Sequence, residues 1–301
     1  MIKDVAHMIL RNGKAKTPLH STSSDDELRV IGSWDAQYKL VAEDIKLSYP
    51  DFELKVDRFG IKQGEIVSLL GPSGSGKSTL LMCLAGLENS GSAKVFLDGV
   101  LLSRSLAQKN IATVFQTPYL FKGTVAYNVG YGLRMRKLPK SEIKARVEGV
   151  LELVGLKGWE RRSILGLSGG EAQRIALARG LVLNPQVMML DEPLSSLDEA
   201  TRKTLSVEFS EILRSQGVTV LYVTHSKQEA FTVSDSVAIM KSGKILVHDK
   251  IKKLFDDLQD PWVQHFLAPD DWWLRFQKRD SLTEQGTGQI QHEVEREKEQ
   301  G

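Results

Sequence analysis

The sequence predicts an α/β fold built around a mostly parallel sheet. Short apolar runs at residues 66–70, 186–190 and 218–223 alternate with stretches of helical pattern, which is the order of strands joined by crossover helices. Each of these runs is followed directly by polar residues. Because the carboxyl ends of parallel strands share one edge of a sheet, and ligands bind at that edge, we expect the functional site there.

The chain before the first of these runs divides into two parts. Residues 1–37 are expected to form an N-terminal extension, in which residues 17–27 are rich in Ser, Thr and Asp and are typical of a linker. From Tyr38 onward, β-like segments at 40–42, 45–49 and 52–59 are separated by charged or turn residues. They predict an antiparallel β subdomain that precedes the parallel sheet.

Residues 71–79 read GPSGSGKST and match the phosphate-binding loop pattern. The glycines let the backbone turn sharply and point its N–H groups inward, and the following helix adds its positive N-terminal end. The pattern predicts a polyphosphate site in which Lys77 reaches the β and γ phosphates and Ser78 binds Mg²⁺. The residues assigned to nucleotide binding here are Gly71, Pro72, Ser73, Gly74, Ser75, Gly76, Lys77, Ser78 and Thr79.

Tyr49 lies at the end of a β-like segment that precedes this loop. Its ring has two interpretations, which the sequence leaves open. It either stacks on a purine base of the nucleotide or packs against the sheet.

After the loop helix, strands are expected at 93–99 and 111–115, followed by helical pattern over 124–154. Residues 138–141 interrupt that pattern, and the residues after the break place apolar side chains on one helix face. Further helices are expected to open at 167–174 and to cover 201–215. These segments supply the helical part of the fold.

An acidic pair, Asp191 and Glu192, follows the apolar run 186–190. After a buried strand, and in a chain that also carries a phosphate-binding loop, such a pair is typical of a nucleotide-hydrolysing site. The first carboxylate holds Mg²⁺, and the second orients or deprotonates the attacking water. The sequence thus predicts ATP and Mg²⁺ chemistry at the sheet edge.

Together these motifs resemble the ATP-binding subunit of an ABC transporter, over about residues 40–265. The resemblance rests on the phosphate-binding loop, on Gln116 after a strand, and on the segments LSGGE (167–171), LDEP (190–193), SSLD (195–198) and VTH (223–225), in that family's order. It implies a P-loop NTPase core over 38–275, with the N-terminal antiparallel β subdomain and an inserted helical subdomain at about 117–167.

The resemblance also implies a role at each matching position. Ser168, Gly169 and Gly170 correspond to the signature loop, which contacts the γ-phosphate held by the opposite subunit, and Asp198 to a loop that crosses the dimer interface. Catalysis is assigned to Glu192, His225, Lys77 and Gln116, where His225 is the switch that hydrogen-bonds the γ-phosphate. The metal ligands are Ser78, Gln116 and Asp191.

One departure from the family pattern is Glu171, which stands where transporters most often have Gln. The spelling LSGGE also occurs in chromosome-maintenance ATPases, but those carry long coiled-coil arms, and the stretch from Lys77 to Ser168 is too short for one. Translation-associated relatives carry two ATPase cores, for which this chain has no room. Excision-repair relatives insert zinc-binding cysteines, whereas this chain has one cysteine, Cys83, which we expect to be buried.

The segment 115–133 is similar to importer ATPases for small solutes. The apolar residues Tyr119, Leu120 and Phe121 are expected to form the groove for a permease's coupling helix, the alternative being that they fold inward. The expected partners are therefore integral-membrane permease subunits, a second ATPase subunit in a homodimer, and a solute-binding protein where the system has one. The expected location is peripheral, on the cytoplasmic face of the membrane.

Composition limits the other functions. Lys and Arg number 40 against 38 Asp and Glu, a net charge of +2, so no nucleic acid is expected as a partner. No stretch reaches the roughly 18 apolar residues of a membrane span.

The segment 261–273 is expected to end the fold rather than dock a partner, and residues 276–301 are expected to be a disordered tail without a regulatory domain. Two other functions stay open, an exporter or lipid-transport ATPase and a soluble ABC ATPase without transport.

Overall fold

The computed structural model describes residues 37–88, 93–254 and 259–268. It divides into two compact units, the first ending at Asp257 and the second beginning at Leu258. The predicted extension 1–37, apart from its last residue, and the predicted tail 276–301 lie outside the described residues, as does the end of the segment 261–273. In the second unit the described helix is α11 (Pro261–Leu267), whose first turn is capped by the Asp260 carboxylate.

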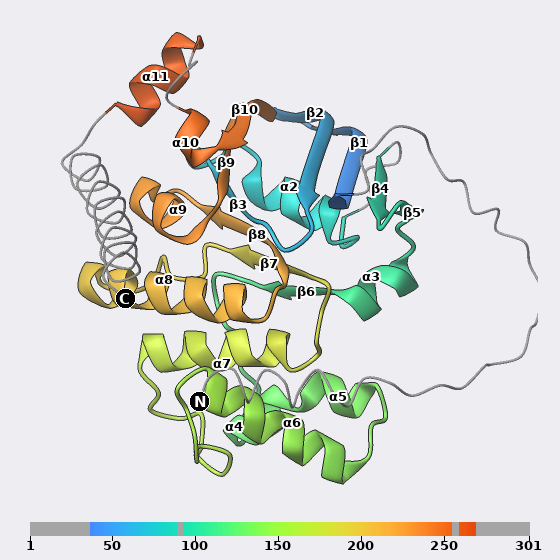
Figure 1. Cartoon of the computed structure of the whole chain (residues 1–301), viewed down its shortest axis with the longest axis vertical. Helices are drawn as coiled ribbons and strands as arrows, with labels where there is room; N and C mark the ends of the chain where they lie inside the picture. Colours follow the sequence, from blue (N-terminus) through green and yellow to red (C-terminus); the bar gives the residue numbers. More distant parts are fainter. Residues whose placement is uncertain (1–36, 89–92, 255–258, 269–301) are drawn as a thin grey trace, which may run out of the picture. The chain divides into compact units, whose positions relative to one another are not determined.

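A six-stranded sheet forms the centre of the first unit (Figure 1). All neighbouring strands pair in parallel except β10 with β9, so the predicted mostly parallel sheet is confirmed. The sequence pattern did not predict β9 or β10. In the order β10-β9-β3-β8-β7-β6, the strands are β10 (Lys244–Lys250), β9 (Ser236–Lys241), β3 (Ile66–Leu70), β8 (Thr219–Thr224), β7 (Val187–Asp191) and β6 (Ile111–Val114).

The predicted antiparallel subdomain is a four-stranded sheet in the order β2-β1-β4-β5. Its strands are β1 (Tyr38–Tyr49), β2 (Phe52–Lys62), β4 (Lys94–Leu97) and β5 (Val100–Leu101). The segments expected at 40–42 and 45–49 are one continuous strand, in which Asp44 has a left-handed backbone with φ of 55°. Apolar residues of this sheet, such as Leu40, Ile45 and Leu54, are buried and pack in one cluster with β3 and helix α2 (Lys77–Leu84).

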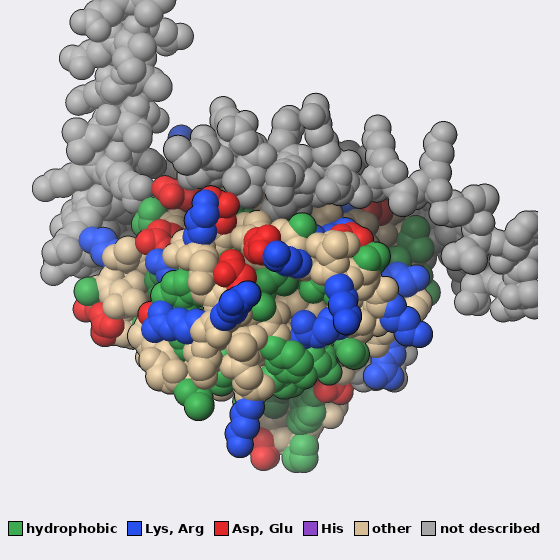
Figure 2. Space-filling model, turned by 90° about the horizontal axis from the view of Figure 1, so that it is seen from below, with side chains coloured by type: hydrophobic (Ala, Val, Ile, Leu, Met, Phe, Trp, Pro, Cys, Tyr) green, Lys and Arg blue, Asp and Glu red, His purple; other side chains and the backbone are tan. Residues whose placement is uncertain are grey.

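The helical subdomain lies between β6 and α7 (Gly169–Leu181) in the sequence. It contains α4 (Val125–Val129), α5 (Tyr131–Met135) and α6 (Lys140–Leu153), and Pro139 stands immediately before α6, at the predicted break. Figure 1 shows these helices at one end of the unit, with α7 and α8 (Glu199–Ser215) between them and the sheet. Seen from that end, the surface carries Lys and Arg side chains interspersed with acidic and hydrophobic ones (Figure 2).

The remaining helices of the first unit border the sheet. They are α3 (Arg104–Asn110), α9 (Lys227–Val233) and α10 (Ile251–Leu254). A second apolar cluster covers the other face of the sheet and extends into the helical subdomain through α7. None of the described helices has both the length and the hydrophobicity that a membrane crossing requires.

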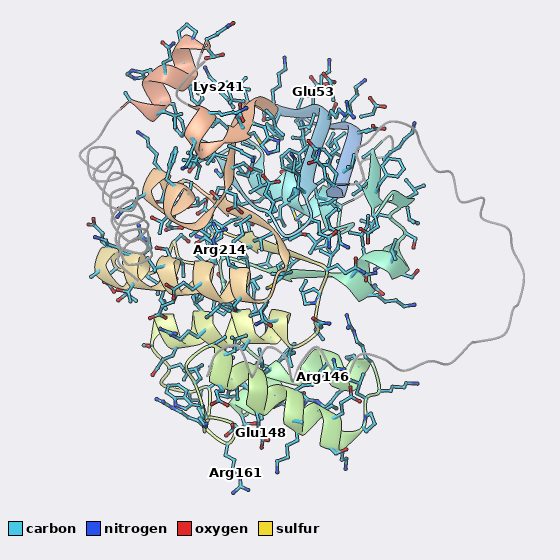
Figure 3. All side chains as sticks on the ribbon, viewed as in Figure 1. Glu53, Arg146, Glu148, Arg161, Arg214 and Lys241 are labelled. Carbon is cyan, nitrogen blue, oxygen red and sulfur yellow. The ribbon has the colours of Figure 1, made fainter. Side chains whose placement is uncertain are left out.

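The turn between β9 and β10 joins the two sheets to the phosphate-binding loop. Its Gly243 N–H donates to the Ser75 carbonyl (2.9 Å), and its own carbonyl accepts from the Lys55 N–H (2.8 Å). Gly243 has a φ of 77°, and a Cβ there would lie 1.8 Å from the carbonyl oxygen of Glu53. Glu53 and Lys241 lie at the same end of the first unit (Figure 3). Only glycine fits this position, because both the backbone angle and the close approach exclude a side chain.

Gly243→Ala is expected to destabilise the protein by about 2 kcal/mol more than the matched change Gly99→Ala. Gly99 has a similar φ of 75°, but a Cβ there would meet nothing within 4 Å. The control therefore measures the backbone strain alone, about 1–2 kcal/mol. Chemical denaturation of the two variants and the wild type makes the comparison. Equal midpoints for the two variants would mean that the contact with Glu53 is not tight in solution.

Candidate functional site

The phosphate-binding loop runs from the buried end of β3 to the start of α2, and close packing fixes two of its glycines. A Cβ at Gly71 would lie 2.2 Å from the carbonyl oxygen of Met240. Gly76 precedes α2 with a φ of 100°, and a Cβ there would lie 2.5 Å from Cζ of Phe52. The loop backbone therefore lies directly against β9 and the β1–β2 hairpin, so both sheets determine its shape.

Lys77, the first residue of α2, is folded back over this loop. Its Nζ donates to the carbonyls of Gly71 (2.9 Å) and Pro72 (3.1 Å) and lies 4.0 Å from Oε1 of Glu192. Burial lowers the pKa of Lys77, and the nearby carboxylates of Glu192 and Asp191 oppose that shift. A buried ammonium that has only carbonyls and carboxylates around it is available for an incoming phosphate.

Ser78 and Asp191 are brought together as the sequence predicted for metal ligands. The Ser78 hydroxyl donates to Oδ1 of Asp191 at 3.0 Å. Burial is the largest influence on Asp191 and raises its pKa, while the Ser78 hydrogen bond acts in the opposite direction. A hydroxyl and a carboxylate beside a phosphate-binding loop are the oxygen ligands that Mg²⁺ accepts, with water and phosphate completing its shell.

Among the described residues, no group of three or more His, Cys, Asp and Glu side chains is placed to hold a metal ion. A site built from Ser78 and Asp191 alone is consistent with that finding, because Mg²⁺ usually takes only one or two carboxylates from the protein and the rest from substrate and water. The residues present therefore fit a magnesium ion that arrives with a nucleotide.

Glu192 and His225 meet because β7 and β8 are neighbours in the sheet. Asp191 pairs with Val223, and Glu192, the next residue, donates its N–H to the Val223 carbonyl (2.9 Å). Its backbone is left-handed, with φ of 45°, and its Oε2 lies 3.1 Å from Nδ1 of His225. A left-handed non-glycine residue is strained, and such strain is concentrated at functional sites. Two of the four residues predicted to be catalytic, Glu192 and His225, are thus in direct contact.

Gln116 follows β6 at the same edge of the sheet, and its side chain is exposed. Its carbonyl accepts from the side chain of Gln173 on α7 (3.0 Å), so the chain leaving the sheet is attached to the helical part of the unit. In the described structure no hydrogen bond joins its side chain to Ser78 or Asp191. The structure therefore places Gln116 at the sheet edge where Asp191 ends the neighbouring strand, without a hydrogen bond to the predicted metal ligands.

Ser168, Gly169 and Gly170 form a second group with Asp198. Ser168 caps α7 in a capping box, in which its hydroxyl accepts from the Glu171 N–H (3.3 Å) and the Glu171 carboxylate accepts from the Ser168 N–H (2.7 Å). This bond lowers the pKa of Glu171. The Glu that departs from the transporter pattern thus has a local role, since either Glu or Gln completes a capping box.

Asp198 has the same kind of role on α8. It caps that helix by accepting from the Thr201 N–H (2.9 Å), a bond that lowers its pKa. Its neighbour Leu197 lies beneath the signature loop, since a Cβ at Gly169 would be 2.8 Å from the Leu197 side chain. Among the described residues, no hydrogen bond or ion pair links this group to Lys77 or Ser78. The predicted site residues therefore form two groups in one chain.

Tyr49 is 44% exposed at the end of β1. Its ring stacks on that of Phe52, with ring centroids 6.2 Å apart, and Phe52 lies against Gly76 in the phosphate-binding loop. The contact with Phe52 fits packing on the sheet, and the exposed part of the ring leaves room for a base, so both interpretations of Tyr49 stay predictions. The importance of Phe52 and Gly243 could not be predicted from the sequence, because it depends on contacts between segments far apart in the chain.

The three apolar residues predicted to form a groove for a partner do not behave alike. Tyr119 (70% exposed) and Phe121 (43% exposed) are at the surface, but Leu120 folds inward against the core. Phe121 lies 4.6 Å from the Tyr131 ring and 6.4 Å from the Tyr127 ring, measured between centroids. We call these four exposed or half-buried rings, Tyr119, Phe121, Tyr127 and Tyr131, the aromatic surface.

Comparison with known proteins gives consistent matches. The family model for ABC transporters matches residues 54–195. The Fe(3+) ions import ATP-binding protein FbpC of Mannheimia succiniciproducens is 46% identical over 210 residues, which is 69% of this chain and 60% of that protein. The sulfate/thiosulfate import ATP-binding protein CysA of Gloeobacter violaceus is 42% identical over 232 residues, 76% of this chain and 67% of that protein.

Among solved structures, cbiO1 from Clostridium perfringens, part of the ABC transporter complex cbiONQ, matches with a TM-score of 0.68 and 29% sequence identity. The match covers 79% of this chain and 99% of that one. The matched part of this chain spans only 54–60% of the length of several FbpC relatives.

Proposed function

The chain belongs to the ABC transporter family, and from this premise we propose that it is the ATP-hydrolysing subunit of a membrane transporter that imports a small solute. The observation that supports this most is the contact of Glu192 with His225 beside Lys77, in a chain whose signature loop forms a separate group. The first group forms the hydrolytic site of this chain. The second group supplies a signature loop that would complete the ATP site of a neighbouring subunit.

In the proposed reaction, the protein positions ATP and stabilises charge. Backbone N–H groups of the loop and the Lys77 ammonium bind the β and γ phosphates, and Tyr49 stacks on the adenine. Ser78 and Asp191, with Gln116 as a further ligand, would hold Mg²⁺, which would supply neutralisation of the phosphate charge. Glu192 takes a proton from the attacking water, and His225 orients Glu192 and hydrogen-bonds the γ-phosphate.

The two separate groups support a dimer. If two chains face each other, the signature loop of one, with Ser168 exposed at the start of α7, lies over the phosphates held by the other. Two glycines at that point allow close backbone approach, and the helix N-terminus favours an anion. Because one chain carries both groups, a homodimer with two working ATP sites is the simplest assembly.

The aromatic surface supports a permease partner. Its rings are exposed or half-buried on the helical subdomain. Arg179 fixes the loop that carries Tyr119 and Phe121 by donating to the carbonyls of Pro118 (2.6 Å) and Tyr119 (3.0 Å). Arg179 lies on α7, which begins at the signature loop. Movement of a permease helix on this surface would therefore reach the ATP site through α7. The proposed chain works at the cytoplasmic face of a membrane, and a solute-binding protein would deliver the solute on the other face.

Affinity purification of the tagged chain from detergent-solubilised membranes tests the proposed function. A multi-pass membrane protein should co-purify, and Phe121→Asp should abolish its recovery while leaving the ATPase activity of the isolated chain intact. Val100→Asp is the matched control, since Val100 is similarly exposed (40%) but lies on the antiparallel sheet. An active ATPase that recovers no membrane protein would instead favour a soluble ABC ATPase. If a partner is recovered, the direction of solute flow in vesicles separates import from export.

A further inference from the structure

A buried carboxylate, Glu229 on α9, lies at the centre of a polar network that the reaction above does not use. Its side chain is 4% exposed, and its Oε2 accepts hydrogen bonds from the hydroxyls of Thr224 and Tyr222, both at 3.1 Å. Its backbone N–H donates to the Ser226 hydroxyl (3.2 Å). The Ser226 N–H in turn donates to the Thr224 hydroxyl (3.0 Å). The residues on both sides of His225 are thus attached to Glu229.

Arg202 on α8 connects this network to the loop that carries Asp198. Its Nη2 donates to the Leu197 carbonyl (2.7 Å), and its Nε lies 3.6 Å from the second oxygen of Glu229. That Nε is buried and has no hydrogen-bond partner, so its compensating interaction is the charge of Glu229. Removing one member of such a pair leaves the other charge buried and unpaired.

The ends of the network are parts of the two groups of site residues. At one end, Leu197 lies beneath Gly169 in the signature loop and precedes Asp198. At the other end, His225 contacts Glu192. The ion pair joins α8 to α9, each directly after one of the two loops. It permits few arrangements of these loops, because a shift of either one breaks hydrogen bonds around the buried Glu229.

We propose that the Arg202–Glu229 pair is a positioning element that holds the Leu197–Asp198 loop and His225 in one catalytic arrangement. In the described structure neither side chain of the pair hydrogen-bonds Lys77, Ser78 or Glu192, and the pair acts through the backbone on either side of His225. The inference rests on the proposed ATPase function. It specifies the contacts that connect two parts of one chain. One part is the Leu197–Asp198 loop beneath the signature loop, which faces the other subunit, and the other is the catalytic His225.

Kinetics of Arg202→Met, Glu229→Gln and the double variant test the pairing. Each single change should lower kcat by about 10- to 100-fold, since small misplacements of catalytic groups have effects of that size. The Kd for ATP should stay within about twofold, because the phosphate-binding loop is untouched. Glu229→Gln keeps an acceptor for Thr224 and Tyr222 and removes the charge. The double variant should be at least about threefold more active than the product of the single effects, since it leaves no unpaired charge.

Arg214→Met is the matched control for losing an arginine of α8. Arg214 lies toward the end of the same helix (Figure 3) and donates to Asp235 (2.5 Å) and to the Val233 carbonyl (3.0 Å). This variant is expected to lose stability while keeping kcat. If Arg202→Met does not fold, Arg202→Lys replaces it in the test. Lys retains the charge but cannot contact both the Leu197 carbonyl and Glu229 as the guanidinium does, so kcat should still fall.

Unchanged kcat in the single variants, strictly multiplicative effects in the double variant, or a loss confined to ATP affinity would each overturn the proposal. A wild-type protein that does not hydrolyse ATP would instead refute the ATPase function itself. The two failures are therefore distinguishable in one set of measurements.

Discussion

Glu192→Gln is expected to lower steady-state ATP turnover by about 10²- to 10⁴-fold, the usual size of lost general-base help. Gln has the shape of Glu and can accept the contact that His225 makes at 3.1 Å, but it cannot take a proton from water. ATP binding should be retained, since the loop and Lys77 are unchanged. The variant should therefore accumulate as an ATP-bound dimer, which gel filtration with ATP and Mg²⁺ would detect.

Glu211→Gln is the control for this experiment, because Glu211 is an exposed carboxylate on α8 outside the site. It should have wild-type turnover. Turnover of Glu192→Gln within about twofold of wild type would show that Glu192 is not the base, and would leave Asp191 as the carboxylate to test next.

Mixing Ser168→Arg with Lys77→Ala is expected to restore activity that neither variant has alone. Lys77→Ala removes the ammonium nearest the loop carbonyls and should weaken ATP binding by the isolated chain. Ser168→Arg should bind ATP normally but fail to close, because a large side chain replaces the exposed cap of α7. In a mixed dimer both changes fall in one site and leave the other intact. If the two sites act independently, an equal mixture should reach roughly a quarter of wild-type turnover.

The mixture needs proof that the two chains associate, which differently tagged chains and co-purification provide. No recovered activity in proven mixed dimers, together with an ATP-bound dimer formed by Ser168→Arg alone, would show that the signature loop does not act on the opposite subunit. Mixing Ser168→Arg with wild type serves as the control for dominant inhibition.

The sequence alone was sufficient for the parallel core and its edge. The apolar runs 66–70 and 218–223 became β3 and β8, which are buried along their full length. Strands covered on both faces have no alternation of polar residues, so they can be recognised in the sequence as continuous apolar runs. The phosphate-binding loop and the pair Asp191–Glu192 could also be recognised, because each is a local sequence pattern that directly follows such an apolar run.

Residues 237–240 of β9 form an apolar run of the same kind, which the prediction missed. Strand β10 contains no buried residue and had no such run, and no local pattern marked the importance of Gly243. Whether Leu120 faces the core, and which arginine pairs with Glu229, also depended on the structure. Each of these is a contact between segments far apart in the chain or a choice of side-chain direction. A motif determines local backbone and chemistry, but burial and pairing depend on which segments pack together, and only the tertiary structure determined that.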